Sequence, residues 1–145
     1  QRIETAIAEP LPAPYVEFVT QYGFVVFGRD QERRCLFDYT ATFPDRQEVR
    51  EGDISFLHEP ARLLMAFENL TTPEFEDDDH SPAFPQNYLP VGNDAGQGQI
   101  LLELGEKAGR VWYWPAREWA WGKEDNTWLG FVAEDFYGFI IGLHP

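Results

Sequence analysis

Three short apolar segments between residues 88 and 114 constrain the fold more than any other part of the sequence. They are Tyr88–Val91, Gln99–Leu104 and Val111–Trp114, each rich in β-branched, aromatic or other large apolar residues. Turn residues separate them, at 92–96 and again at 107–110, and both turns contain glycine. Connections this short join neighbouring strands in antiparallel order. The last third of the chain is therefore predicted to form consecutive antiparallel hairpins.

Two amphipathic segments bracket these strands. The first starts at Pro12, places apolar residues on one helical face as far as Tyr22, and ends at Gly23, a residue that favours the left-handed helix stop. The second is Phe131–Ile141, and its predicted inward side chains are Val132, Phe136, Phe139 and Ile140. Helices placed first and last around consecutive hairpins predict an α+β fold, formed by residues 1–145 as a single domain.

The rest of the chain alternates between apolar runs and polar, proline-bearing stretches. The predicted strands here are Phe24–Phe27, Cys35–Tyr39, Ile54–Leu57 and Trp119–Trp121. A helix is predicted from Pro60 to Phe67, and loops are predicted over Thr42–Asp53 and Thr71–Gln86. The second loop contains Pro73, Pro82 and Pro85, a density of proline that excludes a continuous helix or a central strand.

The charge of the chain is strongly acidic and unevenly distributed. Eleven Lys and Arg against 25 Asp and Glu give a formal net charge of −14, which repels phosphate backbones and anionic membrane surfaces. Between Arg62 and Lys107 there is no basic residue, and the acidic residues there are Glu68, Glu74, Glu76, Asp77, Asp78, Asp79, Asp94, Glu103 and Glu106. We therefore expect neither nucleic acid nor a membrane as a partner.

The densest acidic run, residues 74–79, allows three interpretations. Its oxygen-rich side chains suit calcium or magnesium, but the run lacks the ligand spacing and the glycine of an EF-hand loop. A solvated charge run is the simpler interpretation. The third is a docking segment for a basic protein surface, because complementary charge accelerates encounter and penalises wrong partners.

No set of residues forms a recognisable catalytic motif. Asp94 with Glu103 or Glu106 would make a carboxylate pair, but Asn93-Asp94 before Gly96 is ordinary turn chemistry. The histidines His58, His80 and His144 lack the spacing that sets two imidazoles on one helical face for zinc. Cys35 with a distant histidine is a formal nucleophile pair, although a cysteine beside apolar residues is more often a small buried hydrophobe. We expect no enzyme activity, no cofactor and no metal.

Cys35 is the only cysteine, so the chain forms no intrachain disulfide and fits a reducing compartment. No apolar run approaches the roughly 20 residues that span a bilayer, and residues 1–5 do not resemble a signal peptide. We therefore expect the protein in the cytoplasm.

Two tryptophans alternate along the predicted strand Val111–Trp114. Trp112 and Trp114 share one face, and Val111 and Tyr113 share the other, so both faces are apolar. One face belongs to the core. The other either lies beneath the closing helix, which is the commoner outcome for large rings, or forms part of a partner-binding patch.

Three segments, taken in order, resemble the SUKH superfamily, which includes the Smi and Knr type cell-wall assembly regulators of fungi. They are Leu11–Gly23, Tyr88–Leu104, and the strand Gly109–Trp114 paired with the closing segment Val132–Ile140. The resemblance implies a single α+β domain, with amino-terminal and carboxy-terminal helices packed on a mainly antiparallel, curved sheet, and no catalytic residues. It also implies protein binding, because many bacterial members are immunity proteins that neutralise a cognate toxin, often a nuclease.

We therefore expect a non-catalytic immunity protein that binds a basic toxin domain as a monomer or weak dimer. The expected partner-binding residues are Glu74, Glu76, Asp77, Asp78, Asp79, Asp94, Trp112 and Trp114. The alternative is a regulatory or scaffolding domain that resembles the fungal cell-wall regulators and has a cellular protein partner.

Overall fold

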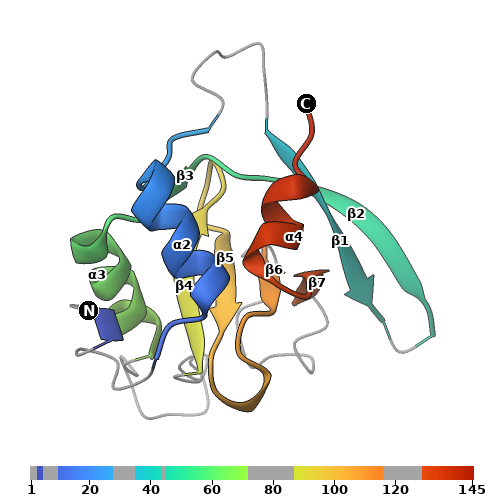
Figure 1. Ribbon diagram of the computed structural model, residues 1–145. Helices are drawn as coiled ribbons and strands as arrows, with labels where there is room; N and C mark the ends of the chain where they lie inside the picture. The colour runs from blue at the N-terminus through green and yellow to red at the C-terminus, as the bar shows by residue number, and fades with distance from the viewer. Residues whose placement is uncertain (1–2, 5–9, 28–34, 44, 72–86, 116–128) are drawn as a thin grey trace.

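The computed structural model describes residues 3–4, 10–27, 35–43, 45–71, 87–115 and 129–145. In these residues seven strands form one antiparallel sheet in the order β2-β1-β7-β6-β5-β4-β3 (Figure 1). The strands are β1 (Leu36–Thr42), β2 (Gln47–Asp53), β3 (Phe56–Leu57), β4 (Tyr88–Asn93), β5 (Gln99–Glu103), β6 (Val111–Trp114) and β7 (Gly130–Ala133). The helices are α2 (Ala13–Tyr22), α3 (Pro60–Thr71) and α4 (Phe136–Ile141), with a 3-10 turn, η1, at Gly105–Lys107.

The predicted hairpins over residues 88–114 are confirmed. β4 pairs with β5, and β5 pairs with β6, each in antiparallel register. Strand alternation sends one set of side chains into the main core, namely Leu89, Val91, Ile100, Leu102, Val111 and Tyr113. The opposite set, which includes Trp112 and Trp114, therefore faces away from that core.

The helices α2 and α4 cover the core face of the sheet (Figure 1). The ring of Phe136 packs edge-on against Tyr15 at 5.2 Å and against Phe18 at 5.3 Å, which joins the two helices. Gly23 ends α2 in the left-handed region, at φ 79°, with its N–H bonded to the Val19 carbonyl. Asp135 caps α4 by accepting from the Gly138 N–H at 2.7 Å. The α+β prediction with amino-terminal and carboxy-terminal helices is thus confirmed.

Two predictions about secondary structure were wrong in a way that matters for the topology. The predicted loop Thr42–Asp53 contains β2, a polar edge strand that pairs with β1 along its whole length. The predicted helix Phe131–Ile141 is instead the strand β7 followed by the short helix α4. β7 lies between β1 and β6, so pairing with two distant strands overrides the local helical pattern.

The remaining elements differ less from expectation. Residues Phe24–Phe27 make one isolated bridge, Val26 to Phe56, and not a full strand. The predicted helix from Pro60 extends to Thr71. The predicted strand Trp119–Trp121 and the loop after Thr71 lie outside the described residues.

Candidate partner-binding surface

A second apolar cluster lies on the sheet face opposite the main core, and we call it the aromatic face. Its centre is Leu101, which is fully buried, and the residues packed on it are Leu70, Tyr88, Trp112, Trp114 and Leu129. Trp112 and Trp114 are half-buried there. The closing helix α4 packs on the main core instead, so these tryptophans do not lie beneath it.

Trp112 is fixed in place by an ion pair that sequence reasoning did not single out. Glu103 accepts from both Nη2 and Nε of Arg110, with distances of 2.8 and 2.9 Å from Nη2 and 3.1 Å from Nε. The indole N–H of Trp112 donates to the same carboxylate at 2.8 Å. Arg110 also stacks 5.2 Å from the Trp112 ring, and Phe131 meets that ring edge-on at 5.4 Å. Every polar group of the indole is therefore satisfied, and its orientation is set before any partner arrives.

The register of β5 and β6 brings these charges together. Leu102 pairs with Val111, so Glu103 and Arg110 occupy the next facing positions, at the start of the η1 turn, and the Glu103 N–H bonds the Arg110 carbonyl at 2.8 Å. The antiparallel register thus places two opposite charges directly across from each other. The Glu103 residue is only 6% exposed, so its charge is used internally and does not contribute to a free acidic surface.

Asp94 is also internal, at 8% exposed. One carboxylate oxygen accepts from the backbone N–H groups of Gly96 at 2.7 Å and Gly98 at 3.0 Å, and the other accepts from the Tyr113 hydroxyl at 2.7 Å. Burial of the Tyr113 side chain, and to a lesser extent its hydrogen bond to Asp94, raises the pKa of Tyr113 well above its usual range. Asp94 thus organises the β4–β5 turn, as its turn-like sequence context indicates.

Asp94 and Glu103 do not converge as a catalytic carboxylate pair. Asp94 bonds Tyr113, whose ring lies in the main core, whereas Glu103 bonds Trp112 on the aromatic face. The two carboxylates therefore belong to opposite faces of the sheet. Burial raises the pKa of the Cys35 thiol, which is the opposite of what a nucleophile needs.

The acidic run Glu74, Glu76, Asp77, Asp78 and Asp79 lies outside the described residues. Two described residues that flank the run belong to the aromatic face. Leu70, near the end of α3, and Tyr88, at the start of β4, both pack in the aromatic face. The described residues that flank the run therefore share one cluster with Trp112 and Trp114.

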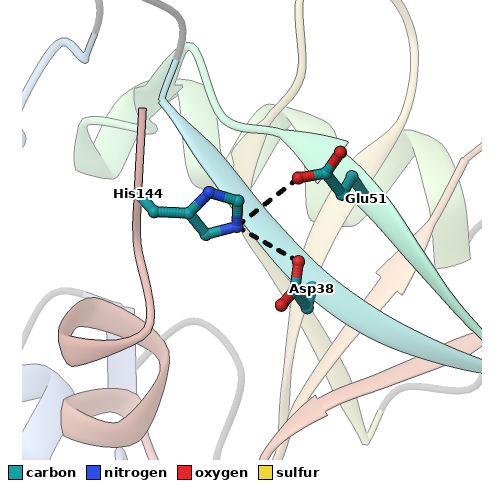
Figure 2. Close-up of side chains that lie close together, drawn as sticks. All are labelled: Asp38, Glu51 and His144. Atoms are coloured by element: carbon teal, nitrogen blue, oxygen red, sulfur yellow. Dashed lines mark hydrogen bonds and ion pairs between the residues drawn. The ribbon is translucent and has the colours of Figure 1, made fainter.

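A histidine and two carboxylates meet on the β1–β2 hairpin (Figure 2). His144 Nε2 lies 3.1 Å from Asp38 Oδ1 and 3.7 Å from Glu51 Oε2. The His144 backbone is held against Leu36 by two hydrogen bonds of 2.7 and 2.9 Å. The bond to Asp38 and a backbone bond to Pro145 raise the pKa of His144. The donor types also suit a divalent cation such as zinc, but the ion pair alone accounts for the arrangement.

An open pocket of about 300 Å³ lies at the β3 edge of the sheet, beside the start of α3. Its lining includes Phe24, Val26 and Phe56, with Glu59 and Arg62 at its rim. Arg62 stacks 5.6 Å from the Phe56 ring. Among these described lining residues, no titratable groups converge in a catalytic geometry.

The model of the SMI1/KNR4 family (SUKH-1) matches residues 1–142. The chain belongs to the SMI1/KNR4 family. The resemblance inferred from the three sequence segments is thereby confirmed. No curated protein and no solved structure matches the chain.

As a SUKH domain, the protein belongs to a family that is generally non-catalytic and acts through protein–protein interaction. None of the helices in the described ranges is long and apolar enough to cross a membrane.

Proposed function

We propose that this SUKH domain is an immunity protein that binds and neutralises a cognate toxin with a basic surface. The observation that carries the proposal is the combination of SUKH-1 membership with an acidic run whose flanking residues pack in the aromatic face. Immunity proteins of this family act by binding their toxins.

Chain length limits how far the acidic run can lie from the aromatic face. A fully extended chain spans at most about 3.6 Å per residue, so the Cα of Glu74 lies within roughly 14 Å of that of Leu70. By the same measure Asp77 lies within roughly 25 Å of Leu70. The acidic run and the indoles of Trp112 and Trp114 can therefore contact one partner surface together.

The two parts of this surface have different physical roles. The acidic side chains attract a basic partner over long range and raise the association rate, because complementary fields steer diffusional encounter. The half-buried indoles supply apolar contact at little entropic cost, because the Glu103 and Arg110 network already holds Trp112 in one orientation. Asp94 contributes indirectly, by fixing the turn between β4 and β5.

A toxin that acts on nucleic acid fits this surface best. Such a protein carries a basic groove for phosphates, and clustered carboxylates replace those phosphates while excluding the substrate. Neutralisation then follows from occlusion of the groove, without any chemistry by the immunity protein.

Co-expression tests the proposal. Cells that express the toxin encoded beside this gene are expected to grow only when this protein is present, and the two proteins are expected to co-purify. Failure of both growth rescue and co-purification contradicts immunity against that toxin. Recovery of a different cellular protein by pull-down, with no toxin gene nearby, favours the regulatory alternative.

The aromatic face is tested with one variant and a matched control. Trp114→Ala is expected to raise the dissociation rate and weaken binding by roughly 30-fold, the effect of losing a hot-spot residue of about 2 kcal/mol. The control is Ile141→Ala, which removes an apolar side chain that is 82% exposed on α4. Equal effects of the two substitutions, in variants with native circular dichroism, refute the assignment.

A further inference from the structure

The strand β2 ends the sheet on one side, where no described residue pairs with its outer edge (Figure 1). The backbone bonds Phe43 N–H to the Arg46 carbonyl, at 2.7 Å, and Ile54 N–H to the Cys35 carbonyl, at 3.0 Å, flank the β1–β2 ladder. Hydrogen-bonded pairs alternate in an antiparallel ladder, so the even-numbered residues of β2 direct their peptide groups toward β1. Gln47, Val49 and Glu51 therefore direct theirs to the outer edge.

β2 carries one apolar side chain, Val49, between the charged residues Glu48 and Arg50. Val49 is 73% exposed at the centre of the strand. Its neighbours Glu48 and Arg50 share the other face and form an ion pair of 2.7 Å with each other. Arg46 contacts the same carboxylate at 2.7 Å.

These features select one register for pairing with a second copy of the same strand. Only the odd-numbered residues of β2 present peptide groups to a second strand, so odd-numbered residues must pair with odd-numbered residues. A two-fold axis between the strands then passes through a residue and not between two residues. The candidates near the strand centre are Glu48, Val49 and Arg50. An axis at Glu48 places the two Glu48 side chains opposite each other, and an axis at Arg50 does the same with the two Arg50 side chains. Repulsion between like charges disfavours both arrangements. An axis at Val49 places each Glu48 opposite the other chain's Arg50.

We propose that β2 is the interface of a homodimer in which two sheets join edge to edge, antiparallel, about a two-fold axis at Val49. Backbone bonds then form at Val49 and between Gln47 and Glu51 of opposite chains. Glu48 and Arg50 form two symmetric ion pairs between the chains, and the two Val49 side chains meet on the opposite face. A single strand edge is a small interface, so the dimer is weak and depends on concentration.

The net charge of −14 on each chain opposes this association over long range. At about 0.15 M salt the Debye length is roughly 8 Å, so repulsion between distant charges is screened, whereas contacts at the strand edge are affected less. The experiment therefore belongs at this ionic strength, with sedimentation equilibrium over a wide range of protein concentration.

Substitutions in β2 test the backbone and charge components separately. Val49→Pro removes only the N–H that points to the outer edge, which an edge strand tolerates, and is expected to weaken the dimer by roughly tenfold or more. Glu48→Arg places like charges opposite each other and is expected to weaken it as well. The double exchange Glu48→Arg with Arg50→Glu restores complementarity and is expected to restore the dimer. Circular dichroism verifies that each variant is folded.

A spin label locates the interface directly. In a Cys35→Ala background, a nitroxide at Val49→Cys is expected to show dipolar broadening at high protein concentration, whereas a label at Met65→Cys on α3 is not. Met65 is a matched site because it is also exposed, at 62%. A protein that remains monomeric at every concentration overturns the proposal, as does a dimer without broadening at position 49 or one that the double exchange fails to restore.

Discussion

Removal of the Asp94 carboxylate is expected to destabilise the protein substantially, because this buried group accepts three hydrogen bonds. Asp94→Ala leaves two backbone N–H groups and the Tyr113 hydroxyl without their buried acceptor. Hydrogen bonds to charged groups contribute about 1.5–3 kcal/mol each, and neighbouring losses are not additive, so we expect a cost of roughly 3–5 kcal/mol. Urea unfolding, followed by tryptophan fluorescence and by circular dichroism, measures this cost.

Two milder substitutions separate the parts of this network. Asp94→Asn retains one acceptor oxygen for the turn amides and a side-chain partner for Tyr113, so its expected cost is about 1–2 kcal/mol. Tyr113→Phe removes only the third bond, with a similar expected cost of about 1–2 kcal/mol. The double variant Asp94→Ala, Tyr113→Phe is expected to cost less than the sum of its parts. A cost below about 1 kcal/mol for Asp94→Ala refutes a structural role for this carboxylate.

Gly98→Ala is expected to lower the free energy of unfolding by about 1–3 kcal/mol, because a Cβ at residue 98 would overlap the Asp94 carboxylate. Gly96→Ala should cost less, because its Cβ would lie 3.5 Å from that carboxylate. Chemical denaturation of the two variants measures the difference. Tyr15→Phe is expected to raise the free energy of unfolding by about 1 kcal/mol, because the buried Tyr15 hydroxyl lacks a hydrogen-bond partner in the described structure. A lower stability of the Tyr15→Phe variant contradicts this prediction. The pKa of His144 is raised in the folded state. Its ion pairs therefore stabilise the protein fully below the unfolded pKa and lose effect as the pH rises through the folded pKa. The stability difference from His144→Gln should shrink as the pH rises above the unfolded pKa of about 6.5, and a constant difference contradicts the assignment.

The elements with strong local signals were predictable from sequence. The helix that ends at Gly23 and the three strands of residues 88–114 have clear periodicity, and their turns contain the residues that such turns require. β2 was missed because Val49 is its only strongly apolar residue, and an edge strand needs few apolar side chains. β7 was missed because Val132 fits the helical spacing of Phe136 and Phe139, and only pairing with two distant strands distinguishes the alternatives.

The candidate surface was predictable only in part. Trp112 and Trp114 were identified from strand alternation, and the structure places both on the aromatic face. The ion pair of Glu103 and Arg110 was missed, because Arg110 was assigned to the predicted turn 107–110 and not to a strand position facing Glu103. The turn role of Asp94 was predicted from its sequence context, but its bond to Tyr113 was not, because the Tyr113 hydroxyl reaches it only through the pairing of β5 with β6.

The association rate with the partner tests the central claim most directly, namely that the acidic run and the aromatic face form one docking surface. The variant Asp77→Lys, Asp78→Lys, Asp79→Lys is expected to lower the association rate constant by about tenfold or more at low salt. The control variant, Glu17→Lys, Asp45→Lys, Glu59→Lys, makes the same change in net charge at exposed sites elsewhere. Stopped-flow or surface plasmon resonance should show a much smaller effect for the control. Equal association rates for the two variants would contradict docking through the acidic run.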